Sequence, residues 1–235
     1  MVQKSRSGIV SRRGLITGGL AISVAAPFIS TGAAFAADKM PVSPDEALQR
    51  LIDGNARYVS DTPINTDHST SRAARALGQQ PFAAIVSCAD SRVAPELIFD
   101  QGPGELFVVR LAGNFISEYG LASLEYGAAV LGIKMIVVLG HSSCGAVTAT
   151  ISSIQDRVLP AGHLPSLVNA IRPAVYDVMA DNPSDLLAAA TAQNARLGAI
   201  KARTEAPILS ELNGTGKLKS AAAVYDIASG EVKFL

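Results

Sequence analysis

The sequence contains no tryptophan, only two cysteines and only three histidines among 235 residues, and 5% of it is aromatic. It has no internal repeat, and beyond about residue 36 no segment is apolar enough to span a bilayer. With 49% hydrophobic residues, the chain is long enough to bury one sizeable core and too short for two large domains. We therefore expect a single folded domain.

The chain as a whole also lacks net charge, because 20 basic residues balance 20 acidic ones. This balance hides an uneven distribution, since Lys4, Arg6, Arg12 and Arg13 all precede the first acidic residue. Without residues 1–36, the chain has 16 basic and 20 acidic residues. Nucleic acids and anionic membranes select a basic surface, so the sequence argues against both as partners.

The first 36 residues have the features of an export signal. A basic region ending in Arg12-Arg13 precedes an apolar stretch to about Ile29, and Ala34-Phe35-Ala36 offers the small residues that signal peptidases accept. Paired arginines before a glycine-containing apolar stretch favour the twin-arginine route. We expect residues 1–36 to be a cleaved signal peptide, leaving a periplasmic protein without a stable membrane anchor. An uncleaved anchor and an ordinary secretion signal are the alternatives.

The remaining residues, 37–235, alternate between helical patterns and short apolar runs. Ser43-Pro44-Asp45-Glu46 is a capping box with proline at the first helical position, which predicts an N-terminal helix. Three runs are short and apolar on both faces, as buried parallel strands are. A helical stripe lies between the second and third runs, which predicts a right-handed crossover in an α/β fold with a central, mostly parallel sheet flanked by helices. The three runs cover residues 82–87, 106–109 and 135–139, and the stripe covers 117–131.

The C-terminal half is predicted to be mainly helical and to end in two strands. Pro173 lies inside the second of these helices and predicts a break or kink there. Ser229-Gly230 is a turn signal between the two strands. We expect helices at 144–154, 164–179 and 184–202, and strands at 222–227 and 231–235.

The two cysteines occupy equivalent positions. Cys88 follows the first apolar run and begins the stretch Cys88-Ala89-Asp90-Ser91-Arg92, whereas Cys144 closes the stretch Gly140-His141-Ser142-Ser143-Cys144 after the third. The carboxyl ends of parallel strands form the edge of an open sheet where ligands bind. Both thiols are therefore expected at that edge, together with Asp90 and His141.

Two thiolates and one imidazole form a ligand set suited to zinc, because sulfur ligands select against magnesium and calcium. The fourth position is open to two interpretations. Asp90 could bind the metal and close the site. Arg92 could instead hold Asp90 in a bidentate ion pair, leaving room for a water whose pKa zinc lowers to about 7.

A disulfide is the simplest alternative for two cysteines in an exported protein. It does not account for the flanking His141, Asp90 and Arg92. Export in the folded state would also let metal bind first in a reducing cytoplasm. His-x-x-Cys alone is a weak motif, but combined with Cys-x-Asp-x-Arg after a second buried strand it favours a metal site.

Five segments, in this order, resemble the β-class carbonic anhydrases, and the likeness extends from Ser43 to Leu235. The segments are Cys88-Ala89-Asp90-Ser91-Arg92-Val93, Gly104-Glu105-Leu106-Phe107-Val108-Val109-Arg110, Ala112-Gly113-Asn114, Ser123-Leu124-Glu125-Tyr126 and Gly140-His141-Ser142-Ser143-Cys144-Gly145. The resemblance implies a catalytic domain over residues 37–235 that reversibly hydrates CO2 to bicarbonate and a proton. It also implies assembly into a homodimer or tetramer, and no organic cofactor.

By the same resemblance, Cys88, His141 and Cys144 bind Zn2+, and Asp90 with Arg92 forms the dyad that orients or deprotonates the zinc-bound water. In this family, the counterpart of Asp90 can also move onto the metal and switch the enzyme off. We therefore count Asp90 both as a catalytic residue and as a conditional metal ligand.

The expected substrate pocket follows the plant-like branch of the family. Gln79, Phe107 and Tyr126 fall at the spacings of that branch's pocket residues, and Gly145 could aim a backbone amide at an anion. Some bacterial members inhibit themselves with bicarbonate at a site that includes a tryptophan, which this chain lacks, so we expect no such inhibition. Leu111 departs from the family pattern, where asparagine often follows the arginine.

Two other functions fit the same residues. The first is hydrolysis of carbonyl sulfide or carbon disulfide on the same zinc site. The second is a zinc-binding or dimerisation module without catalysis. Retention of both Asp90 and Arg92 argues against the second, because a purely structural site needs no arginine beside the fourth ligand.

Overall fold

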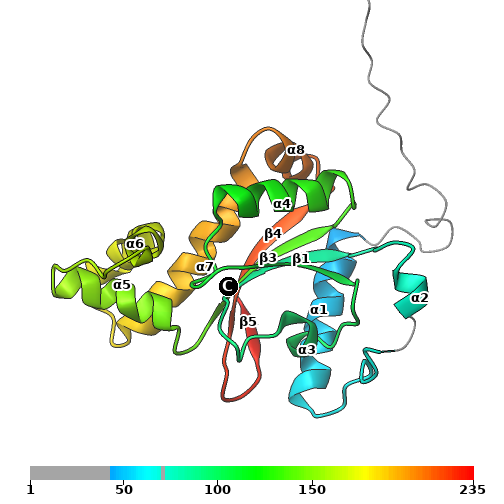
Figure 1. Ribbon diagram of the computed structural model, residues 1–235, viewed down its shortest axis with the longest axis horizontal. Coiled ribbons are helices and arrows are strands. Elements are labelled where there is room, and N and C mark those ends of the chain that lie inside the picture. Colours follow the sequence, from blue (N-terminus) through cyan, green and yellow to red (C-terminus); the bar gives the residue numbers. More distant parts are fainter. Residues whose placement is uncertain (1–42, 70–71) are drawn as a thin grey trace, which may run out of the picture. The chain divides into compact units, whose positions relative to one another are not determined.

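A computed structural model describes residues 43–69 and 72–235 of the chain (Figure 1). The predicted signal peptide, residues 1–36, lies outside the described residues. Among the helices that are described, none combines the length and apolarity needed to cross a membrane.

Five strands form one sheet in the order β2-β1-β3-β4-β5. The first four pair in parallel and β5 is antiparallel to β4, which confirms the predicted α/β fold with a mostly parallel sheet. Because β2 and β3 flank β1, the predicted crossover from β2 to β3 passes over β1. The strands are β1 (Ala83–Ser87), β2 (Leu106–Arg110), β3 (Met135–His141), β4 (Lys219–Tyr225) and β5 (Val232–Phe234).

Alternating side chains of the sheet enter two separate cores. Ala83 and Ile85 pack on one face with residues of α1 (Pro44–Val59) and α3 (Pro95–Ile98). Ala84 and Val86 pack on the other face. That second face is covered by α4 (Glu118–Ala129), α7 (Leu186–Thr204) and α8 (Ile208–Gly214), as Figure 1 shows. Helices on both faces explain why β1 is apolar up to Val86 and β3 up to Leu139.

A third core lies beyond the carboxyl end of β3. There α5 (Gly145–Gln155), α6 (Leu164–Met179) and α7 pack together, and Val147, Ile171 and Val175 enclose both cysteines. Of the break or kink predicted at Pro173, the break is wrong, because α6 continues through it. Pro173 and Asn169 are both exposed, so water can satisfy the Asn169 carbonyl that proline leaves without a donor.

Three short helices lie outside the elements predicted above. Residues 61–78 are polar and show no clear periodicity, and α2 (Arg72–Arg75) lies within them; the sequence predicted neither α3 nor α8. Helices of four and seven residues are too short to show periodicity. The β4 strand begins at Lys219, three residues before the predicted start, because Lys219-Ser220-Ala221 lacks the apolar character of a strand.

Candidate metal centre

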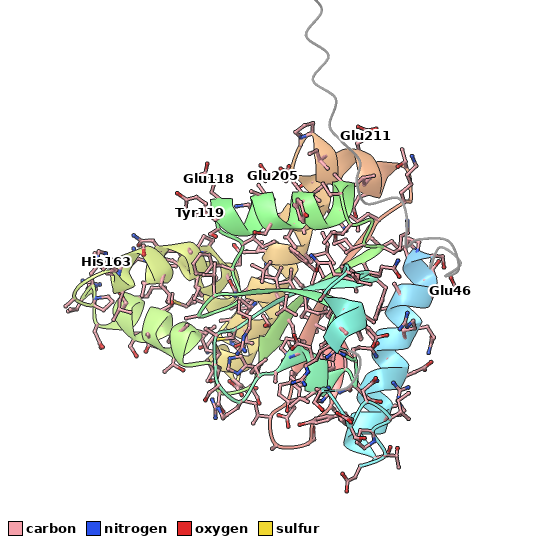
Figure 2. All side chains as sticks on the ribbon, turned by 45° about the vertical axis from the view of Figure 1, so that its right-hand side comes forward. Glu46, Glu118, Tyr119, His163, Glu205 and Glu211 are labelled. Atoms are coloured by element: carbon pink, nitrogen blue, oxygen red, sulfur yellow. The ribbon has the colours of Figure 1, made fainter. Side chains whose placement is uncertain are left out.

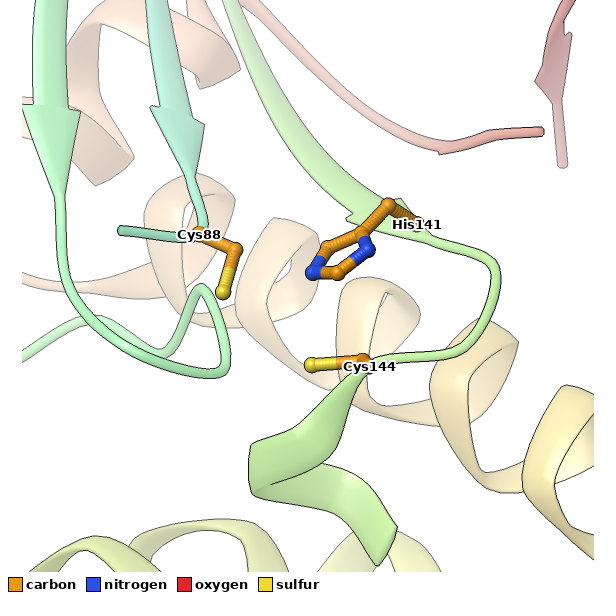
Figure 3. A group of neighbouring side chains, drawn as sticks. All are labelled: Cys88, His141 and Cys144. Atoms are coloured by element: carbon orange, nitrogen blue, oxygen red, sulfur yellow. The ribbon is translucent and has the colours of Figure 1, made fainter. Parts of the chain in front are cut away.

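Three side chains from separate segments converge at the carboxyl edge of the sheet (Figure 3). Cys88 directly follows β1, His141 is the last residue of β3, and Cys144 is the N-cap of α5. One ligand atom from each lies within 4.8 Å of the other two. All three residues are buried, with at most 4% of their surface exposed. The structure therefore brings together the three ligands that the sequence predicted.

The turn between His141 and Cys144 brings these two ligands together. Ser143 has φ of 56°, an uncommon conformation for a residue other than glycine, and it reverses the chain within three residues. The turn ends at the N-terminus of α5, whose free backbone amides favour negative charge. A thiolate at Cys144 is thus placed where the helix stabilises it.

The Cys88 and Cys144 thiols influence each other's pKa. The hydrogen bond with Cys144 lowers the pKa of Cys88 to about 4, whereas the same interaction raises the pKa of Cys144. Without metal, Cys88 therefore ionises more readily than Cys144. A cation that binds both thiolates displaces the remaining proton.

The orientation of His141 directs its second ring nitrogen toward the sulfurs. Nδ1 lies 2.9 Å from the Ser142 carbonyl oxygen, which can only accept, so Nδ1 carries the proton. Nε2 then has a lone pair, yet it is buried and has no hydrogen-bond partner. Burial lowers the pKa of His141, but the nearby Cys88 thiolate, the Ser142 carbonyl and Asp90 together raise it by more. A buried acceptor beside two thiols is suited to a metal ion.

The loop that carries Cys88 is held by a residue that the sequence analysis did not single out. The guanidinium of Arg110, the last residue of β2, donates to the carbonyls of Cys88 at 3.0 Å and of Asp90 at 2.7 Å. Arg110 lies within one of the family-like segments, but bonds to backbone carbonyls leave no pattern in the sequence. Its role is visible only in three dimensions.

Asp90 is engaged by Arg92 through three hydrogen bonds. The Arg92 guanidinium donates to Oδ1 at 2.9 Å and to Oδ2 at 2.7 Å, and the Arg92 backbone amide also donates to Oδ1, at 3.0 Å. The guanidinium thereby holds the pKa of Asp90 well below its usual range. The same Oδ2 lies 4.0 Å from Nε2 of His141. Asp90 therefore borders the centre without joining the three clustered ligands.

The donor set fits zinc. Two thiols, one of them already acidic, and one correctly protonated imidazole are the ligands of a zinc site that keeps a position open. Of the two interpretations of Asp90, the structure shows the ion pair with Arg92. Binding of Asp90 to the metal stays a prediction for a second state.

One of the four predicted substrate residues lies beside the ligands. Gly145 is exposed, and a Cβ added there would meet no atom within 4 Å. The rings of Phe107 and Tyr126 lie together, 6.4 Å between centroids, but Phe107 pairs with Ala84 near the start of β1. At about 3.3 Å per residue, that register places it about 13 Å along the strand from Cys88.

Gln79 is exposed and precedes β1, so it also lies toward the opposite edge of the sheet from the ligands. Within one protomer, Gln79, Phe107 and Tyr126 therefore do not line the metal centre.

A family profile described as carbonic anhydrase matches residues 83–232. Carbonic anhydrase 2 of Mycobacterium tuberculosis is 48% identical over 134 residues, which cover 57% of this chain and 65% of that protein. Carbonic anhydrase of Synechococcus elongatus is 33% identical over 194 residues, which cover 79% of this chain and 70% of that protein. The match to the Mycobacterium protein thus spans just under two thirds of its length.

Solved structures of β-carbonic anhydrases also match this chain. The β-carbonic anhydrase CcaA matches with a TM-score of 0.61 and 30% identity, covering 80% of this chain and 91% of that one. The Coccomyxa β-carbonic anhydrase, solved with acetazolamide, matches with a TM-score of 0.62 and 28% identity, covering 80% and 86%.

Fold and site together define an α/β protein with a candidate metal centre of two cysteines and one histidine at the edge of its sheet. This chain belongs to the β-carbonic anhydrase family.

Proposed function

We propose that this protein binds one Zn2+ through Cys88, His141 and Cys144 and reversibly hydrates CO2 to bicarbonate and a proton. The observation that carries the proposal is the buried, unpartnered Nε2 of His141 facing two thiols, with Asp90 held beside it by Arg92. Family membership supports the same reaction. A bound zinc supplies a Lewis acid that makes water a nucleophile near neutral pH.

The residues around the centre can orient a bound water and provide a route for its proton to solvent. Asp90 stays ionised because of Arg92, so its carboxylate can accept a hydrogen bond from a water at the centre and orient that water. Exposure increases outward from buried His141 through half-buried Asp90 to exposed Arg92. A proton released at the centre therefore has a short route to solvent.

We further infer that the protein works as a homo-oligomer in which a second protomer completes the substrate pocket. Phe107 and Tyr126 lie too far along the strand from Cys88 to serve their own metal centre. The α4 surface beside them is exposed and partly apolar, as Tyr119 shows in Figure 2. Two β-carbonic anhydrases of Sordaria macrospora, which share this fold, are described as tetrameric.

Stopped-flow CO2 hydration by the purified protein, with zinc measured in the same sample, tests the proposed reaction. We expect zinc-dependent hydration far above buffer, inhibition by acetazolamide, and loss of both zinc and activity in Cys144→Ser. Asp90→Asn should keep its zinc and lose most of its activity. A protein with one zinc per chain and no hydration above buffer would contradict the proposed enzymatic activity. Faster turnover of carbonyl sulfide than of CO2 would make carbonyl sulfide the preferred substrate.

We also propose export to the periplasm, on the strength of the pattern in residues 1–36. Fractionation of cells that express the full chain tests it. Replacing Arg12 and Arg13 together by lysine should retain the protein in the cytoplasm. Unchanged periplasmic recovery would point to the ordinary secretion route.

A further inference from the structure

Two side chains of α7 hold the loop that contains Gly113 and Ile116, which adjoins the candidate metal centre. The Asn194 amide donates to the Gly113 carbonyl at 2.7 Å, and the Lys201 ammonium donates to the Ile116 carbonyl at 3.1 Å. These residues are seven apart, two helical turns along one face of α7. Asn194 is 5% exposed, so its bond to Gly113 is shielded from water.

Gly113 is in direct contact with a predicted metal ligand. Its backbone N–H donates to Sγ of Cys88 at 3.2 Å. Asn194 therefore binds the carbonyl of the same residue whose amide reaches the sulfur. One hydrogen bond separates Asn194 from Gly113, and a second separates Gly113 from Cys88.

Gly113 cannot fix its own orientation. Its φ is 82°, and a Cβ there would lie 2.4 Å from Cδ1 of Ile171 and 3.1 Å from Cβ of Ala146. Only glycine fits, and glycine has no side chain to pack and a wide range of allowed dihedral angles. The direction of its N–H must therefore be set by the bonds that the neighbouring groups make to it.

We propose that Asn194 is a positioning residue of the metal centre, which holds Gly113 so that its amide stabilises the Cys88 thiolate. Donors to a ligating atom orient that atom and tune the metal, and losing such a partner costs about 10- to 100-fold in metal affinity. This inference rests on the proposed zinc site. It assigns to α7 a part in zinc binding although α7 contributes no ligand.

Zinc affinity of the full chain, measured by competition with a chelating dye, tests the proposal. Asn194→Leu keeps the branched shape of the side chain and removes its donor. We expect about 10- to 100-fold weaker zinc binding in this variant. Lys201→Met is the matched control, since it removes the second α7 anchor at Ile116 but leaves Gly113 held, and it should bind zinc as the wild type does.

The absorption spectrum of the cobalt-substituted protein provides a second measurement, which loss of packing alone would not change. A hydrogen bond to a thiolate lowers the energy of the sulfur lone pair, so its loss should shift the thiolate-to-cobalt charge-transfer band to longer wavelength in Asn194→Leu. Lys201→Met should keep the wild-type band. If Asn194→Leu is insoluble, Asn194→Ser, whose hydroxyl is too short to reach Gly113, should show the same two changes.

The outcomes separate this inference from the proposed function. Wild-type affinity and an unshifted band in a folded Asn194 variant would overturn the role of Asn194 alone. Equal losses in Asn194→Leu and Lys201→Met would overturn it too, because a general loosening of the loop would then explain both. A wild-type protein that binds no zinc would overturn the proposed function and this inference with it.

Discussion

At the scale of single residues, Arg92 decides the position of Asp90. Its guanidinium donates to both carboxylate oxygens, so Arg92→Gln should free Asp90 and reduce CO2 hydration at neutral pH by about 100-fold, the loss expected when a group that orients a reactant is misplaced. Zinc content should stay unchanged, because the three ligands are untouched. Stopped-flow rates per zinc measure the effect.

Arg196→Gln is the matched control, since it removes the same charge from an exposed site on α7. It should hydrate CO2 at the wild-type rate. Full activity in Arg92→Gln would show that Asp90 needs no partner to act.

The candidate metal ligands could be predicted from the sequence, whereas the residues that hold the ligand-bearing loops in place could not. Cys88, His141 and Cys144 stand out because thiols and imidazoles are rare here and follow apolar strands. Arg110 and Asn194 act through bonds to backbone carbonyls, and such bonds require only that the two segments meet in space. The folded chain was needed to find them.

At the scale of elements, the Gly113 loop must pack between α5 and α6 without a side chain. Gly113→Ala should lower the free energy of unfolding by more than about 2 kcal/mol, roughly the sum of overpacking and left-handed strain, and should weaken zinc binding. Thermal unfolding of the metal-free protein and chelator competition measure the two effects.

Gly104→Ala separates strain from overpacking. Gly104 has φ of 96°, but a Cβ there would meet no atom within 4 Å. It should cost about 1 to 2 kcal/mol from backbone strain alone and leave zinc binding intact. Equal effects of the two substitutions would mean that the contacts with Ile171 and Ala146 relax freely.

A second element-scale prediction concerns Asp100, which ties the end of α1 to the following loop. It accepts from the Arg57 side chain and from the amides of Ile64 and Asn65, at 3.1 and 2.9 Å. Burial alone would raise the pKa of Asp100, but these donors together hold it below its usual value. Asp100→Asn should therefore cost about 2 kcal/mol near neutral pH, measured by urea unfolding.

The sign of the pH dependence follows from that lowered pKa. Stability from Asp100 is fully present above the usual carboxyl pKa and is lost as the pH falls through the folded-state pKa. The acid side of the stability profile should thus be less steep in Asp100→Asn. Exposed Asp53→Asn should change stability by less than about 0.5 kcal/mol, and a similar loss there would argue against the network.

The elements themselves were predicted unevenly, for physical reasons. Strands β1, β2 and β3 begin with continuous apolar runs because helices cover both faces, so they stand out in the sequence. The strand order could not be read from periodicity, which reports burial and not neighbours. The helix does not break at Pro173 because this residue is exposed and water can replace the missing donor, and exposure is a tertiary property.

At the scale of the whole molecule, activity and association are predicted to fall together. Val130, just after α4, is 64% exposed on the surface proposed to face a second protomer. Val130→Glu should shift the protein toward monomer in sedimentation velocity and lower hydration per zinc. Leu159→Glu, at a 53% exposed leucine between α5 and α6, should do neither. A fully active monomer would contradict the shared pocket.

X-ray absorption at the zinc edge tests the central claim most directly, because it identifies the metal and its ligand atoms in one experiment. For the purified full-length protein at neutral pH, the account predicts one zinc per chain with two sulfurs at about 2.3 Å and two nitrogen or oxygen neighbours at about 2.0 to 2.1 Å. Protein that carries no zinc, with Cys88 and Cys144 joined in a disulfide, would contradict it, as would zinc without sulfur neighbours.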